Sequence, residues 1–226
     1  MLKENYLFIQ QKIEKAAHKS GRKLSDITLV VVTKTIPAEL IQQALDCGVI
    51  HLGENKVQEA HQKRPFLEKF KATHHLIGHL QTNKAKKAVQ LFDLIQSVDS
   101  FKCAEVLNRV AKDANKRQRC LIEVKTSDEE NKTGLARSEV DQLISEFTRY
   151  DNLVLEGLMT IPPLSLEGEK LRNHFKEFKK FFDDKKNAFR ENPILSMGMS
   201  NDFEVAIEEG ATMVRLGRAF FGERLK

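Results

Sequence analysis

Residues 27–35 read I-T-L-V-V-V-T-K-T, and this stretch decides the fold. Its first six positions hold five apolar residues, four of them β-branched, and so predict an extended strand too apolar to face water on either side. A strand buried on both faces belongs to a parallel sheet covered by helices, and ligands of such sheets bind beyond the carboxyl ends of the strands. Lys34 follows the strand, so it stands at the end where a ligand would bind.

The position of Lys34 suggests a chemical role. A strand-end lysine among apolar neighbours can have its pKa lowered by desolvation, which makes a neutral amine available to attack a carbonyl. On this segment alone, the simpler interpretation is that Lys34 extends its ammonium into solvent. Residues elsewhere in the chain have to distinguish the two.

Extended and helical patterns alternate along the rest of the chain. Further strands are expected over residues 49–53, 74–80, 94–98, 120–124, 153–161, 194–199 and 213–216. Helices are expected over residues 3–19, 37–48, 56–71, 83–91, 101–116, 138–150, 169–190 and 203–208. The helix over 169–190 carries a phenylalanine stripe that predicts core packing, made of Phe175, Phe178, Phe181 and Phe182.

This alternation predicts an α/β fold. About eight strands and eight helices in 226 residues indicate a closed (β/α)8 TIM-type barrel with an extra N-terminal helix, forming a single domain over residues 1–226. An open, doubly wound sheet with a similar number of strands is the alternative. In a barrel, functional groups gather where the strands run into the following loops.

The composition excludes several classes of protein. No apolar run approaches the roughly 18 residues that a membrane span needs, and the charged start of the chain predicts no signal peptide. Cys47, Cys103 and Cys120 form no CxxC pair, which favours a cytoplasmic protein without disulfides or zinc. His75 and His79 lack the glutamate of H-E-x-x-H, so we expect no metal.

The charge favours small anionic ligands. The formal net charge is +5, but the basic runs are short and lie beside predicted helices. The chain has no tryptophan to alternate with them, as a nucleic-acid-binding surface would need. We therefore expect no nucleic-acid binding.

Two loops carry the features of an anion site. The segment Gly198-Met199-Ser200-Asn201-Asp202 joins the seventh predicted strand to a short helix, with Ser200 or Asn201 as the N-cap and Glu204 in the first turn. Free backbone N–H groups at such a helix start bind phosphate.

The eighth predicted strand is followed by Gly217, which lets the backbone approach a ligand, and by the positive charge of Arg218. Phosphate sites in barrels are typically built from the loops after strands seven and eight. An ordinary capped helix with a glycine turn would explain the same residues. Combined with a carbonyl-reactive Lys34 in the same mouth, however, they describe a phosphorylated aldehyde as the ligand.

Six longer stretches resemble one known family. They are V-V-V-T-K-T, H-L-G-E-N-K-V-Q-E, H-H-L-I-G-H-L-Q-T-N-K, G-L-M-T-I-P, L-S-M-G-M-S-N-D-F-E-V-A-I and M-V-R-L-G-R-A-F-F-G, and they extend nearly from end to end of the chain. The chain resembles the pyridoxal phosphate homeostasis proteins, single-domain relatives of the alanine racemase N-terminal barrel.

The resemblance implies a role for each candidate residue. Lys34 would form a Schiff base with the aldehyde of pyridoxal 5'-phosphate, and Asn55 and Met159 would line the ring pocket. Ser200, Gly217 and the neighbouring backbone would hold the phosphate, and Arg215 would face the pyridine nitrogen. Because arginine is always protonated, it would donate to an unprotonated ring nitrogen and leave the ring a poorer electron sink.

The chain departs from the family pattern at two positions. His74 stands where tryptophan is usual, and Lys125 stands where asparagine is common. The charged segment 128–134 predicts a mobile loop over the barrel mouth, and its Lys132 raises the question of a second cofactor site.

Two classes of function compete. The first is a non-catalytic monomeric carrier that acts in vitamin B6 homeostasis and hands the cofactor to pyridoxal-phosphate-dependent apo-enzymes. The second is an amino-acid racemase of low activity, which needs acid/base groups on both faces of the cofactor. We expect the carrier, because the chain ends after the eighth strand and its only tyrosines, Tyr6 and Tyr150, lie on predicted helices. A Schiff-base aldolase would fit the lysine and the phosphate site but not the six stretches.

Overall fold

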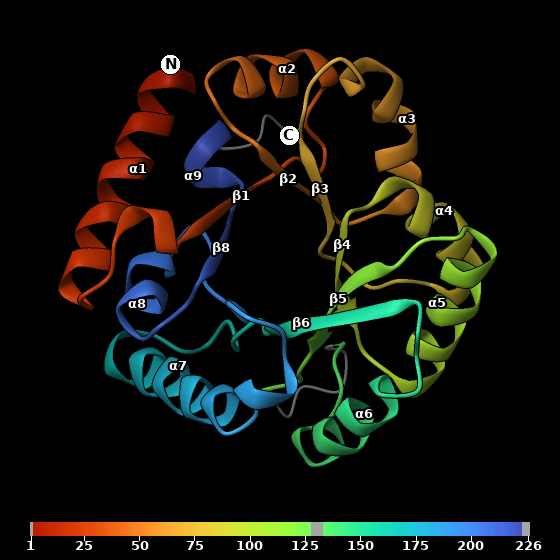
Figure 1. Cartoon of the computed structure of the whole chain (residues 1–226). Helices are drawn as coiled ribbons and strands as arrows, with labels where there is room; N and C mark the ends of the chain where they lie inside the picture. The colour runs from red at the N-terminus through yellow and green to blue at the C-terminus, as the bar shows by residue number, and fades with distance from the viewer. Residues whose placement is uncertain (1, 128–132, 223–226) are drawn as a thin grey trace.

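The protein is a closed parallel barrel surrounded by helices (Figure 1). Its structure, a computed structural model, describes residues 2–127 and 133–222. The strands follow one another around the barrel in chain order, and β1 (Thr28–Val32) pairs with β8 (Met213–Leu216) to close it. The predicted barrel is confirmed. The alternative of an open sheet is wrong, because the first and last strands of an open sheet do not pair, whereas β1 and β8 do.

The structure gives bounds close to those expected for most elements. The other strands are β2 (His51–Glu54), β3 (Thr73–Leu76), β4 (Leu94–Val98), β5 (Gln118–Glu123), β6 (Leu153–Met159) and β7 (Ile194–Ser196). The α-helices are α1 (Leu2–Lys19), α2 (Ala38–Asp46), α3 (Val57–Leu67), α4 (Ala85–Leu91), α5 (Phe101–Asp113), α6 (Val140–Phe147), α7 (Gly168–Asp183), α8 (Phe203–Glu208) and α9 (Arg218–Phe221). Single 3-10 turns are η1 (Leu24–Asp26), η2 (Thr82–Lys84), η3 (Arg137–Glu139) and η4 (Lys186–Ala188).

Two strands end earlier than their apolar patterns predict. The strand expected over 74–80 stops at Leu76, and the one expected over 194–199 stops at Ser196. Glycines follow in both cases. Gly78 passes so close to the chain after β2 that a Cβ there would lie 2.5 Å from the carbonyl oxygen of Asn55, and Gly198 turns the chain at φ +97°. The apolar residues beyond these strands line loops instead.

The N-terminal helix α1 packs on the outside of the barrel beside α8 and α9, as Figure 1 shows. Its inner face is buried through Ile9, Ile13, Ala16 and Ala17. The Asn5 amide donates to the Phe220 carbonyl at 2.9 Å, and the Lys12 ammonium lies 2.7 Å from Glu204. The extra helix therefore covers the last two helices of the barrel.

The phenylalanine stripe of α7 is core packing, as predicted. Phe175, Phe178 and Phe182 are buried, while Phe181 is half-buried with the Lys185 ammonium 4.4 Å from its ring centroid. Within the described ranges 2–127 and 133–222, no helix combines the length and the apolar character that crossing a membrane requires.

Candidate functional site

Lys34 lies in a turn just beyond the carboxyl end of β1, and its side chain is half-buried. The next residue, Thr35, has the left-handed φ of 64°, which a non-glycine residue adopts only when its surroundings hold it there. Thr33, on the other side of Lys34, is buried. The backbone that presents Lys34 is therefore constrained on both sides.

Lys63 of α3 supplies much of this constraint. Its Nζ donates to the Thr33 carbonyl at 2.7 Å, to Oε1 of Glu54 at 2.7 Å and to Oε1 of Glu59 at 2.6 Å. The Thr33 hydroxyl also donates to Glu54, at 2.7 Å, and the Thr35 N–H donates to Glu59 at 2.5 Å. Burial raises the pKa of Glu54, and the Lys63 ammonium opposes that rise.

Arg215 lies inside the barrel on β8, the strand that pairs with β1, which leads to Lys34. In the parallel register, Arg215 of β8 is opposite Val30 of β1. Its guanidinium donates to the Ser196 hydroxyl at 2.6 Å and to the Thr160 carbonyl at 2.9 Å. Burial lowers the pKa of Arg215 to about 10, with Glu123 and Asp202 acting in the opposite direction, so the group is still cationic at neutral pH.

Ser200 connects the loops that follow β7 and β8. Its hydroxyl oxygen accepts the N–H of Ala219 at 3.2 Å. Gly217, which precedes Ala219 by two residues, lies against β1, because a Cβ there would be 3.4 Å from the Cβ of Val32. The two residues expected to hold a phosphate thus belong to neighbouring loops, one of which touches the strand leading to Lys34.

The expected N-cap of α8 is wrong. The N-cap is Asp202, rather than Ser200 or Asn201, and its carboxylate accepts the N–H of Met199 at 2.5 Å. Asp202 can reach back in this way because Gly198 turns the chain just before Met199. Glu204 does lie in the first helical turn, as predicted.

Asn55 and Met159 complete the expected set. Asn55 directly follows β2 and is half-buried beside Gly78. Met159 is the last residue of β6 and is fully buried in the barrel with Val30 and Met213. The expected site residues therefore all lie at or near the carboxyl ends of their strands: Lys34, Asn55, Met159, Ser200, Arg215 and Gly217.

Glu123 is a buried acid at the same end that the sequence analysis did not select. It is the last residue of β5 and only 3% exposed. One of its oxygens accepts the Thr133 hydroxyl at 2.8 Å, and the other makes no hydrogen bond to any described residue. Burial raises the pKa of Glu123, whereas Arg215 lowers it. Glu123 borders a hollow of about 220 Å³ beside Ser127 and Ile161.

The histidines form pairs rather than a metal site. His79, after β3, lies 2.6 Å from the carboxylate of Asp99, after β4. His75 instead faces His51 inside the barrel, with 3.0 Å between the ring nitrogens. Over residues 2–127 and 133–222, no three His, Cys, Asp or Glu side chains come together in a way that could hold a metal ion.

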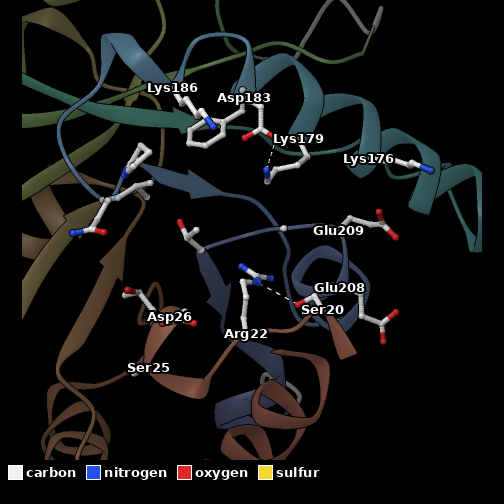
Figure 2. A pocket seen from close by; sticks show the side chains of 17 residues that line it. Ser20, Arg22, Ser25, Asp26, Lys176, Lys179, Asp183, Lys186, Glu208 and Glu209 are labelled. Atoms are coloured by element: carbon white, nitrogen blue, oxygen red, sulfur yellow. Dashed lines mark hydrogen bonds and ion pairs between the residues drawn. The ribbon is translucent and has the colours of Figure 1, made fainter. Parts of the chain in front are cut away.

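A larger hollow, of about 780 Å³, lies at the opposite end of the strands (Figure 2). It is bordered by the residues that lead into β1, β7 and β8, and none of the expected site residues borders it. Figure 2 shows Arg22 reaching Ser20 and Lys179 reaching Asp183, and these contacts measure 3.1 and 2.5 Å. Arg22 also donates to the backbone carbonyls of Ala211 and Ile207, so it helps to hold this end of the barrel together.

The departures from the family pattern have different surroundings. His74 donates its backbone N–H to Asp93 at 2.7 Å, and burial lowers the pKa of its ring to about 4. Lys125 borders the small hollow next to Glu123. Residues 128–132, including Lys132, lie outside the described residues, so the loop expected over the mouth is not placed.

Comparisons with known proteins cover almost the whole chain. The family described as the alanine racemase N-terminal domain matches residues 8–225. The pyridoxal phosphate homeostasis protein of Aquifex aeolicus is 39% identical over 217 residues, which make up 96% of this chain and 95% of that relative.

Solved structures agree with the sequence relatives. PipY of Synechococcus elongatus, determined with PLP bound, matches with a TM-score of 0.86 and 32% identity over 98% of this chain and 100% of PipY. An alanine racemase of Clostridium difficile matches 99% of this chain and 57% of its own, with a TM-score of 0.77 and 17% identity, and so shares the barrel fold. The chain therefore belongs to the pyridoxal phosphate homeostasis protein family, which is built on the barrel of the alanine racemase N-terminal domain.

Proposed function

We propose that this protein binds pyridoxal 5'-phosphate as a Schiff base on Lys34 and acts as a carrier in intracellular vitamin B6 and amino-acid homeostasis. PipY, a relative of nearly identical extent, has been determined with PLP bound. The free thiols of Cys47, Cys103 and Cys120 suit a reducing cytoplasm. The recipients are apo-enzymes that depend on pyridoxal phosphate, and the carrier works as a monomer.

The observation that carries this proposal is the buried cation beside the Lys34 strand. Arg215 is held by Ser196 and Thr160, and its other N–H bonds have no acceptor among the described residues. Such a group can donate to a ring nitrogen and keep it unprotonated. When bound, the cofactor supplies an aldehyde carbon that amines attack. Lys34 would provide the amine, and the contact of Lys63 with Thr33 helps to fix the turn that carries it.

The remaining residues orient the ligand. The Ser200 hydroxyl and the backbone N–H groups around Gly217 would donate hydrogen bonds to the phosphate, and the formal charge of +5 also favours an anion. Asn55 and Met159 would border the ring. Asn55 follows β2 and Met159 ends β6, which are opposite one another in strand order, so the ring would lie between these two residues.

The positions of the two tyrosines support the carrier over the racemase. Tyr6 lies on the outer helix α1 and donates to the Gly48 carbonyl, and Tyr150 packs on Phe147 at the end of α6. The racemase is retained as the second candidate because one pair, His79 with Asp99, stands at the carboxyl ends of β3 and β4 and could exchange a proton.

Borohydride reduction and peptide mapping test the attachment. The protein is incubated with pyridoxal 5'-phosphate, its visible absorption is recorded, and the adduct is reduced and mapped. The pyridoxyl group is expected on Lys34 and is lost in Lys34→Ala but not in the matched variant Lys56→Ala, whose side chain is exposed. A label on another lysine in the wild-type protein would refute the proposal.

A second assay separates carrier from racemase. Purified protein with bound cofactor and L-alanine should form no more D-alanine than Lys34→Ala does. If D-alanine forms and His79→Gln abolishes it, the racemase is correct.

A further inference from the structure

A continuous chain of hydrogen bonds runs through the barrel interior from Arg215. Arg215 donates to the Ser196 hydroxyl at 2.6 Å, and Ser196 donates to the Gln96 side-chain oxygen at 2.6 Å. The Gln96 amide nitrogen lies 3.0 Å from Nδ1 of His75, and Nε2 of His75 lies 3.0 Å from Nδ1 of His51. The five side chains come from β8, β7, β4, β3 and β2, and we name them the Arg215 chain.

The Arg215 chain is almost entirely removed from water. Ser196 and Gln96 are fully buried, His75 is 1% exposed and Arg215 is 3% exposed, whereas His51 is half-buried at the far end. A buried polar group that loses its partner costs about 1–3 kcal/mol. Each member therefore holds the next one in a single orientation.

Arg215 sets the donor and the acceptor of every hydrogen bond in the Arg215 chain. Because Arg215 can only donate, the Ser196 oxygen accepts from it, and the serine hydrogen is available to Gln96. The Gln96 oxygen is then an acceptor, so its amide nitrogen donates to Nδ1 of His75. His75 must carry its hydrogen on Nε2 and donate it to His51. Burial lowers the pKa of both rings, which agrees with two neutral histidines.

Gln96 is fixed by a second contact as well. The same amide nitrogen lies 3.2 Å from the sulfur of Met213, two residues before Arg215 on β8. Rotation of the Gln96 amide would therefore break contacts to Ser196, His75 and Met213 together. A change at Gln96 is transmitted to Arg215 through one intervening hydroxyl.

We propose that Gln96 and His75 are positioning residues, which orient the Arg215 guanidinium so that it donates to the ring nitrogen of the cofactor and selects ligands that have this acceptor. The inference rests on the proposed function, because it requires a pyridine ring above Arg215. It adds a specificity role for residues that do not touch the ligand and lie deeper in the barrel.

The test compares two ligands on matched variants. Pyridoxal 5'-phosphate and its 1-deaza analogue, in which a C–H replaces the ring nitrogen, are titrated into wild-type protein, Gln96→Leu and Gln118→Leu. Gln118, at the start of β5, is also a fully buried glutamine, but it donates to the backbone carbonyls of Asp93 and Arg119 and lies outside the Arg215 chain. The absorption maximum of the bound ligand is recorded in each case.

Wild-type protein and Gln118→Leu should prefer the natural cofactor over the analogue. In Gln96→Leu, the ratio of the two affinities should fall about tenfold. The absorption maximum should shift for the natural cofactor only. Ser196→Ala, a smaller change that breaks the same chain, should lose the preference too and covers the case in which Gln96→Leu does not fold.

Two results would overturn the inference: an equal preference in Gln96→Leu and Gln118→Leu, or a wild-type protein that does not distinguish the ligands. Failure of the proposed function looks different, because wild-type protein would then bind neither ligand through Lys34.

Discussion

The ammonium of Lys63 lies 2.7 Å from Oε1 of Glu54, and both side chains are largely buried beside the turn that carries Lys34. The pair joins α3 to the end of β2, and Lys63 also holds the Thr33 carbonyl. A helix residue thereby fixes the backbone next to the proposed nucleophile.

Lys63→Met should destabilise the fold strongly. The change leaves Glu54 and Glu59 without their buried cation, and breaking a buried ion pair by removing one partner costs about 3–5 kcal/mol. Urea unfolding measures the loss, with Lys56→Met, at an exposed position, as the control. Adding Glu54→Gln should restore part of the stability. A loss below about 1 kcal/mol would mean that the cluster does not hold the turn.

The His74 ring should make the protein less stable in mild acid. The unfolded chain protonates this ring below pH 6.5, but burial keeps it neutral in the folded state down to about pH 4. Between these values the unfolded state binds more protons, so stability falls as the pH falls. His74 contributes at most about 2 kcal/mol of this loss at pH 5.

Urea unfolding at pH 7 and pH 5 measures the effect of His74. His74→Gln should show a smaller drop between the two pH values than wild-type protein, and the exposed His61→Gln should show the full drop. Equal drops in all three proteins would contradict the assignment. His75 and His51, whose pKa values burial also lowers, supply a drop in the same direction that remains in all variants.

Gly198→Ala should damage the loop that carries Ser200. Gly198 has φ +97°, and an added Cβ would lie 2.6 Å from the Cβ of Ala206. Gly21→Ala is the matched control, since Gly21 also has a positive φ but nothing within 4 Å of the added atom. We expect Gly198→Ala to lose about 2 kcal/mol more than Gly21→Ala by thermal unfolding, because it adds a clash to the backbone strain. Similar losses would show that the loop relaxes.

Ser200→Ala should weaken binding of pyridoxal 5'-phosphate more than binding of unphosphorylated pyridoxal. The hydroxyl joins the loops after β7 and β8, and losing a hydrogen bond to an anion costs about fivefold or more in affinity. Titration of both ligands by absorbance provides the comparison, with the exposed Ser145→Ala as the control. Equal losses for the two ligands would place the phosphate elsewhere.

The local pattern of the chain predicted most of the barrel. Alternating strand and helix periods, with glycines and Pro37 at the boundaries, indicated the fold, and Leu94–Val98 and Met213–Leu216 have the bounds expected. Candidate site residues could be identified because parallel strands bring their carboxyl ends to one face. The overlong strand before Gly78 shows the limit of this approach, since apolar residues also line loops that pack on the barrel.

The sequence by itself determined which residues stand at the strand ends, because side-chain chemistry and local periodicity are written in consecutive positions. Only the tertiary structure decided which side chains face one another inside the barrel. Gln96 and Ser196 are 100 positions apart, and they meet because strand register and barrel closure turn both side chains inward. Polar residues within apolar strands were the available signal, but their partners depend on the closed geometry. Lys63 was hidden for the same reason, since its role arises only when α3 packs beside the end of β1.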